Sequence, residues 1–241
     1  MNEKTAQFSL RGLFQPRDLT EGTPWKTILA FALPIIISYL LQQVYTISDA
    51  AIVGQTLTAG EVAGVNDTTS IIFIFLQFAF GVSAGFCVVT AAEVGAHHEA
   101  GVRRSLAAQI LLSAALTVLL TGLALLLLKP MLAWINVTPE SPEVYRAAHT
   151  YCAIIFAGIG AQLFYNFICS FLRSMGDSVT PLLFLLFSTI LNIGLDLLFI
   201  VSFHWGVAGA AIATVLSQAV GAAWIIRFLT GKKTILRLRR D

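Results

Sequence analysis

The sequence predicts an all-α integral membrane protein in which six transmembrane helices form one bundle. Hydrophobic residues make up 57% of the 241 residues and charged residues 12%, whereas a soluble domain is about 25% charged. Six apolar segments each reach the length of roughly 20 residues that a bilayer-crossing helix needs. Lys and Arg gather in the segments that fall on one side of the membrane when these spans are threaded in order.

The predicted spans are separated by short polar loops. They cover residues 27–53, 62–94, 105–128, 149–172, 181–203 and 207–229. Residues 27–229 therefore form the predicted membrane domain, which follows a polar segment, 1–26, and precedes a basic tail, 230–241. In the longest loop, the Ser/Thr-Pro-Glu pattern of residues 138–143 predicts the start of a short surface helix.

The distribution of positive charge predicts the orientation. Of the 15 Lys and Arg residues, 13 fall on the side that holds both termini, and only Lys129 and Arg146 fall on the other. Because Lys and Arg accumulate in cytoplasmic loops, we expect a multi-pass protein of the inner (plasma) membrane with both termini in the cytoplasm. The lipid bilayer is then its surroundings, and no nucleic-acid partner is expected.

No motif of catalysis or nucleotide binding occurs in the chain. A phosphate-binding loop, a nucleophile elbow and an HExxH pair are all absent from the sequence, so we predict a protein that is not an enzyme and has no bound cofactor. Cys87, Cys152 and Cys169 lie inside apolar segments without a CxxC pair, which predicts buried thiols rather than disulfides or a zinc site. Any pumping must be driven by an ion gradient or by another subunit.

Two aspartates interrupt these apolar spans. Asp49 lies in the first span and Asp196 in the fifth. A charged side chain at bilayer depth costs several kcal/mol, about 2.5–3.5 on insertion scales, and such residues mark ion, proton or substrate sites. A neutral aspartic acid bonded to a backbone carbonyl is the alternative, and it gives these residues no function.

Further polar residues share faces with the two aspartates. Asn192 lies one helical turn before Asp196, and Thr214 lies in the sixth span. If spans 1, 5 and 6 meet, Asp49, Asn192, Asp196 and Thr214 offer the oxygen ligands that hard cations such as Na⁺ prefer. Alternatively, the carboxyl pair binds a proton, because burial and a second carboxylate both favour the neutral form. Asn192 and Thr214 could also simply bond neighbouring helices.

Other mid-span polar residues are weaker candidates for a substrate cavity. These are Gln42, Tyr45, Gln77 and Asn166. Gln42 and Tyr45 share the face of Asp49 in the predicted first helix, at spacings of three, four and seven residues. Polar groups of this kind more often hold membrane helices together, and the same alternative applies to Gln109 and Gln162.

Four motifs in register resemble the multidrug and toxic compound extrusion (MATE) family. They are SDAAIVG around Asp49, LRSMGD ending at Asp177, NIGLD ending at Asp196 and GVAGAA beginning at Gly206. The resemblance is nearest to the bacterial branch that includes DNA-damage-inducible and multidrug-efflux members, and it covers residues 19–229. It implies a secondary antiporter that exports organic cations or drugs in exchange for Na⁺ or H⁺.

The resemblance also implies roles and a larger architecture. The family's ion site matches Asp49, Asn192, Asp196 and Thr214 in this chain, and its first helix bends near a proline that matches Pro34. The family has twelve helices in two lobes, so the resemblance implies that this chain is the N-terminal six-helix lobe, with 230–241 as a tail or interlobe linker. A second six-helix lobe, in the same or a separate chain, is the expected partner.

Two other functions remain open from the sequence. A lipid-linked saccharide flippase of the same superfamily would move an anionic lipid, but no Lys or Arg lies in the middle of a span. A non-transporting truncated membrane fragment or accessory subunit is the second alternative.

Overall fold

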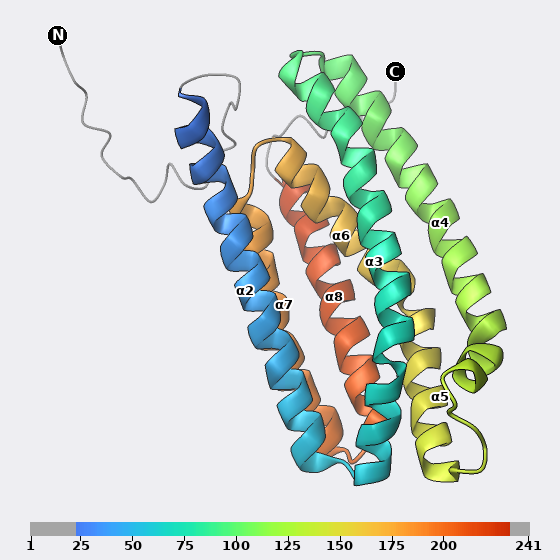
Figure 1. The fold of residues 1–241 in the computed structure, drawn as a ribbon. Helices are drawn as coiled ribbons and strands as arrows, with labels where there is room; N and C mark the ends of the chain where they lie inside the picture. Colours follow the sequence, from blue (N-terminus) through green and yellow to red (C-terminus); the bar gives the residue numbers. More distant parts are fainter. Residues whose placement is uncertain (1–22, 232–241) are drawn as a thin grey trace.

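A computed structural model describes residues 23–231, and within them the chain is helical throughout (Figure 1). The helices are α2 (Pro24–Thr56), α3 (Ala59–Gly95), α4 (Glu99–Trp134), α5 (Pro142–Ala157), α6 (Ile159–Ser174), α7 (Val179–Asp196), the π-helical segment η1 (Leu197–Ser202) and α8 (Gly206–Gly231). The polar segment before residue 23 and the tail after residue 231 lie outside the described residues.

The six-span prediction is confirmed for the described residues. Five helical stretches, with α7 and η1 counted as one, are long and apolar enough to cross a membrane, and the bent pair α5–α6 makes a sixth. The helices are longer than predicted at several ends, and α4 starts six residues before residue 105. The helices continue past their apolar stretches because an α-helix makes its backbone hydrogen bonds internally, so it need not end where the bilayer ends.

The fourth span differs from its prediction in two ways. The expected short surface helix near residue 142 is instead the first turn of α5 itself, with Pro142 in the N-terminal position that suits proline. The span is also broken: α5 and α6 meet at Gly158 with a bend of 47°. Gly158 is required there because a Cβ would lie 2.3 Å from a methyl carbon of Val215 on α8.

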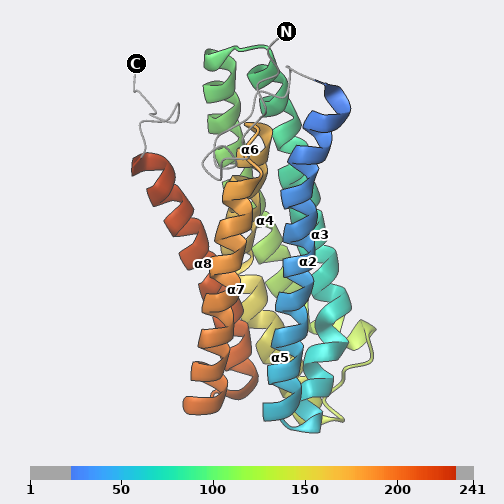
Figure 2. The same cartoon turned by 90° about the vertical axis from the view of Figure 1, so that its left-hand side faces the viewer.

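The helices run along one common axis, and their turns divide between two ends (Figures 1 and 2). One end holds the first turn of α2, the α3–α4 turn, the α6–α7 turn and the last turn of α8, and we call it the basic end because Arg103, Arg104 and Arg173 lie there. The other end holds the α2–α3 turn, the α4–α5 loop and the turn before α8.

The core lies among α3, α4, α5, α6 and α8, and α2 lies at its edge. Small residues let the core helices approach closely, as at Ala79, Ala124 and Ala148, each fully buried. By contrast, α2 packs mainly against α7, and only Pro34, Ser38 and Val53 of its 33 residues are buried. Many of its other side chains are apolar and exposed, among them Leu29, Leu40 and Ile47, so α2 is held to the bundle mainly by α7.

Proline does not interrupt α2. The helix continues from Pro24 to Thr56 with Pro34 inside it, and the hydroxyl of Ser38 donates a hydrogen bond to the Pro34 carbonyl, at 2.8 Å. A bend at Pro34 that depends on the ion site stays a prediction.

Candidate functional site

Asn192 and Asp196 occupy the last two turns of α7, and both side chains have no exposed surface. The α-helix ends at Asp196, and the chain continues as the π-helical segment η1. Wider π-type turns are rare and often occur at functional sites. Here η1 is fixed against α8, because Gly209 lets the backbone of Phe199 approach and Trp205 stacks on the Phe199 ring at 5.0 Å. The backbone is therefore fixed on both sides of Asp196, by α7 before it and by the contact of η1 with α8 after it.

Asp49 reaches Asp196 because α2 packs on α7. The two carboxyl groups interact directly, within hydrogen-bonding reach of one another. As carboxylates, both groups only accept hydrogen bonds, and neither oxygen of Asp196, nor Oδ1 of Asp49, has a donor among the described residues. Two facing acceptors without a donor require a shared proton or a bound cation between them.

The side-chain amide of Asn192 is equally unpartnered. Both its oxygen and its nitrogen are buried without a hydrogen bond from the described residues. An amide that merely joined two membrane helices would bond across the contact, and this one does not. The structure thus leaves the Asn192 oxygen available to a ligand one turn from Asp196.

A hydrogen bond between Tyr45 and Thr214 joins α8 to α2 near the two aspartates. The phenol of Tyr45 on α2 donates a hydrogen bond to the Thr214 hydroxyl on α8, at 3.4 Å. Tyr45 also interacts electrostatically with Asp49 and Asp196. The three helices that the sequence analysis required to meet, α2, α7 and α8, do meet here.

One residue of this cluster was not found from the sequence. Tyr151 of α5 interacts electrostatically with Asp49, Tyr45 and Asp196. A tyrosine in an apolar helix has no distinctive spacing, and its nearness to the acidic pair depends on how α5 packs against α3 and α8. The cluster of small residues around it, Ala147, Ala148 and Cys152, is the one sequence signal of a close approach.

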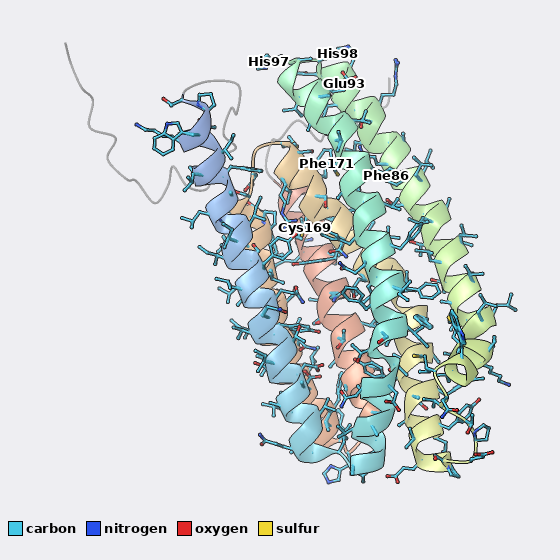
Figure 3. The ribbon with its side chains drawn as sticks, in the orientation of Figure 1. Phe86, Glu93, His97, His98, Cys169 and Phe171 are labelled. Atoms are coloured by element: carbon cyan, nitrogen blue, oxygen red, sulfur yellow. The ribbon has the colours of Figure 1, made fainter. Side chains whose placement is uncertain are left out.

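The site contains oxygen ligands and no basic side chain. In α2, α7 and α8 the basic residues are Lys26 and Arg227, both at the basic end. The ion pairs Glu93–His98, at 2.8 Å, and Glu99–Arg103, at 3.7 Å, also lie at that end, where Figure 3 shows Glu93, His97 and His98. Among the described residues no group of three His, Cys, Asp or Glu could hold a metal ion. The donor set therefore suits a proton or a hard monovalent cation rather than a transition metal.

The remaining substrate-cavity candidates are not gathered at this site. Gln42 on α2 and Gln77 on α3 are exposed, and Asn166 on α6 is half-buried. Of the four candidates, only Tyr45 contacts the residues around the aspartates. A substrate role for Gln42, Gln77 and Asn166 stays a prediction.

Comparisons with known proteins agree with this arrangement of helices. The MatE family model matches residues 34–198. The "Probable multidrug resistance protein YpnP" of Bacillus subtilis is 31% identical over 224 residues, covering 90% of this chain and 48% of that protein. The "DNA damage-inducible protein F" of Escherichia coli is 28% identical over 89% of this chain and 45% of its own.

Solved structures share the fold. One is described as the outward-facing conformation of a multidrug resistance MATE family transporter of the MOP superfamily, and it superposes with a TM-score of 0.82 at 27% identity. The match covers 89% of this chain and 47% of that one. The chain thus spans about half the length of the relatives it matches.

Proposed function

Because the chain belongs to the MatE family of multidrug and toxic compound extrusion transporters, we propose that it forms the ion-coupling lobe of a secondary active antiporter. The observation that carries this proposal is the close approach of Asp49 and Asp196, where three carboxyl oxygens are buried without a donor among the described residues. In this proposal they alternately bind and release H⁺ or Na⁺, and the exchange drives the export of small organic cations or drugs.

The chemistry of the pair supports such an exchange. One shared proton turns one carboxyl into a donor for the other and removes the repulsion between two buried negative charges. When that proton leaves, a cation held by the two carboxylates, with the oxygens of Asn192 and Thr214, restores the balance of charge. Proton and cation therefore compete for one site.

The position of α2 offers a link between occupancy and movement. Asp49 lies on α2 and Asp196 on α7, and α2 packs mainly against α7. A bound ion attracts both carboxylates and favours close packing of the two helices, whereas an empty site separates them by repulsion. In the proposed cycle, this change alters the surface that α2 presents to the rest of the transporter.

The remaining parts of the proposal rest on the half-length match. The chain spans about half of its relatives, and we propose that it is the N-terminal lobe and works with a second six-helix lobe. We also propose that the chain lies in the inner membrane with its basic end in the cytoplasm, because Lys and Arg accumulate on the cytoplasmic side of membrane proteins. The acidic interior around Asp49 and Asp196 favours a cationic substrate, and no observation favours the flippase or the non-transporting alternative.

Ion binding to the purified chain in lipid nanodiscs tests the proposal. We expect saturable binding of radiolabelled Na⁺ that weakens as pH falls, because protons occupy the same oxygens. If the pair takes protons only, Na⁺ does not bind, and a pH indicator instead detects a proton taken up by the chain as pH falls. Whichever signal the unchanged chain gives, Na⁺ binding or proton uptake, should fall by about tenfold or more in Asp196→Asn and in Asp49→Asn, since each variant loses one carboxylate.

Asp67→Asn is the matched control, because Asp67 is an exposed carboxylate on α3, and it should leave both signals unchanged. The proposal fails if folded Asp196→Asn binds Na⁺ and protons as the unchanged chain does. A second measurement is drug efflux by the complete transporter, which should be lost in the same two variants.

A further inference from the structure

A line of buried polar atoms without partners leads from the acidic pair to the basic end. Besides Asn192 and the aspartates, the unpartnered atoms of this line are the Gln218 oxygen, the Ser188 hydroxyl, the Tyr165 hydroxyl and Nε of Arg173. Each is buried, and none bonds to another described residue with good geometry. Native proteins leave few such atoms, and those that occur are usually met by internal water.

The line starts on α7 and α8, beside the site. Ser188 lies one turn from Asn192, and Gln218 lies one turn from Thr214, in both cases toward the basic end. One turn of helix advances the chain by about 5–6 Å, which is the spacing that one or two hydrogen-bonded waters span. Both helices therefore carry a buried polar atom one turn from the site, on the side of the basic end.

The line then passes to α6 at a glycine of α8. A Cβ on Gly221 would lie 2.4 Å from the Ser188 hydroxyl oxygen and 3.4 Å from a ring carbon of Tyr165. Three helices thus converge at a point where even a methyl group would displace the Ser188 hydroxyl. Gly221 keeps this point open, and the hydroxyls of Tyr165 and Ser188 interact beside it.

On α6 the line continues at intervals of one helical turn. Tyr165, Cys169 and Arg173 are spaced by four residues and share one face. Cys169 interacts with both Tyr165 and Arg173, and Figure 3 shows Cys169 in the half of the bundle nearer the basic end. Arg173 lies in the last turn of α6 and is half-exposed, so the line opens at that end.

We propose that Ser188, Gln218, Tyr165, Cys169 and Arg173 line a water-filled route inside the lobe, along which protons leave or reach Asp196. Hydroxyl groups and water both donate and accept hydrogen bonds. In each step one O–H bond forms on the acceptor while one breaks on the donor, and the net change is one proton moved from the Asp196 carboxyl to bulk water. The positive charge of Arg173 at the opening disfavours passage of Na⁺.

This inference rests on the proposed function, and it adds the path by which the coupling site communicates with the basic end. That end is cytoplasmic if the charge distribution sets the orientation. The route lies within the six described spans, so it does not depend on the second lobe.

Hydroxyl-radical footprinting tests the presence of water, because radicals formed from bound water oxidise the side chains beside it. The chain in lipid nanodiscs supplies its own control: Cys169 and Cys87 are similarly buried, at 4% and 5% exposure. Cys87 instead lies between α3 and α4, where its thiol donates to the Gln109 oxygen at 3.6 Å. We expect Cys169 to oxidise about fivefold faster or more. Equal rates for the two cysteines in folded protein would overturn the route.

Proton release after a pH jump tests the proton role, with the amplitude and the rate read separately. Gly221→Ala should slow release by about tenfold and leave its amplitude unchanged, because the added methyl displaces the Ser188 hydroxyl from the line. Gly122→Ala is the control, since a Cβ there meets nothing within 4 Å. Ser188→Ala, which adds no volume, serves if Gly221→Ala does not fold. Unchanged rates in both variants would refute the proton role.

The two failures are distinguishable in the same traces. If the proposed function is wrong, Asp196→Asn leaves the amplitude of proton release unchanged. If only the route is wrong, Asp196→Asn lowers the amplitude, but Gly221→Ala and Ser188→Ala leave the rate of release unchanged.

Discussion

Two polar clusters lie inside this apolar bundle, and they differ in whether their hydrogen bonds are made. Between α3 and α4, the amide nitrogen of Gln109 lies 2.9 Å from the Phe86 carbonyl oxygen, 2.6 Å from the Thr90 hydroxyl and 2.7 Å from the Ser105 hydroxyl. Between α2 and α7, the oxygens of Asp196 and both polar atoms of Asn192 have no partner among the described residues.

The difference separates a structural contact from a binding site. The Gln109 cluster provides its own donors and acceptors, so it stabilises the packing of α3 against α4 and has no capacity left for a ligand. The acidic cluster is incomplete, and leaving a buried polar group unpaired costs about 1–3 kcal/mol. Such an arrangement is stable only when water, a proton or a cation completes it.

Replacing the amides by leucine should affect the two clusters in opposite ways, and this is the largest effect on stability that we expect. Gln109→Leu should lower the free energy of unfolding by about 1–2 kcal/mol, because the Phe86 carbonyl and the two hydroxyls lose their donor. Asn192→Leu, in ion-free buffer, should leave the free energy of unfolding unchanged or raise it, because an unpaired amide is replaced by an apolar group. Equilibrium unfolding in detergent measures both.

The ion affinities of the same two variants also distinguish the two clusters. Gln109→Leu should bind Na⁺ or protons as the unchanged chain does, whereas Asn192→Leu should bind more weakly. A large loss of stability in Asn192→Leu would show that Asn192 joins helices and would contradict the distinction.

Tyr151→Phe tests whether α5 belongs to the acidic cluster. The phenol interacts with both aspartates, and its loss should weaken ion binding about fivefold, or about 1 kcal/mol, without unfolding the protein. Binding titrations measure the change. Tyr39→Phe is the control, because Tyr39 on α2 is 57% exposed. An unchanged affinity in Tyr151→Phe would exclude this residue from the site.

Thr90→Val should have the smallest effect. Gln109 would lose one of its three acceptors, and Ser105 would lose its bond to Thr90, at 2.9 Å. Bonds between membrane helices average about 0.6 kcal/mol, so the free energy of unfolding should fall by about that amount. Thr69→Val on the same helix, at an exposed position, should change it less. A loss as large as that of Gln109→Leu would mean that the cluster acts as one cooperative unit.

The number of spans was predictable because it depends on local composition. Each apolar segment reaches membrane length by itself, and the Pro142 and Gly206 helix starts follow from residue type and turn geometry. The bend at Gly158 was not predictable. Glycine is common in membrane helices, and it is the packing of Val215 against this particular glycine that requires the absence of a side chain.

Within the site, the aspartates were predictable and their surroundings were not. Asp49 and Asp196 were identified because a charge in an apolar span is rare. Asn192 was singled out by its spacing of one helical turn from Asp196, whereas Asn166 and Gln109 were both mid-span polar groups that the sequence could not tell apart. The structure distinguishes them, since Gln109 is bonded, Asn192 is unpaired and Asn166 is half-buried on α6.

The sequence by itself determined that this is a helical, multi-pass membrane protein, and it determined which side chains are costly to bury. Those properties depend on single residues and on their spacing along one helix. Only the tertiary structure decided that Asp49 approaches Asp196, that Tyr151 interacts with both, and that Ser188 of α7 and Tyr165 of α6 meet at Gly221 of α8. These contacts join helices far apart in the chain, so their existence depends on how whole helices pack and not on any local pattern.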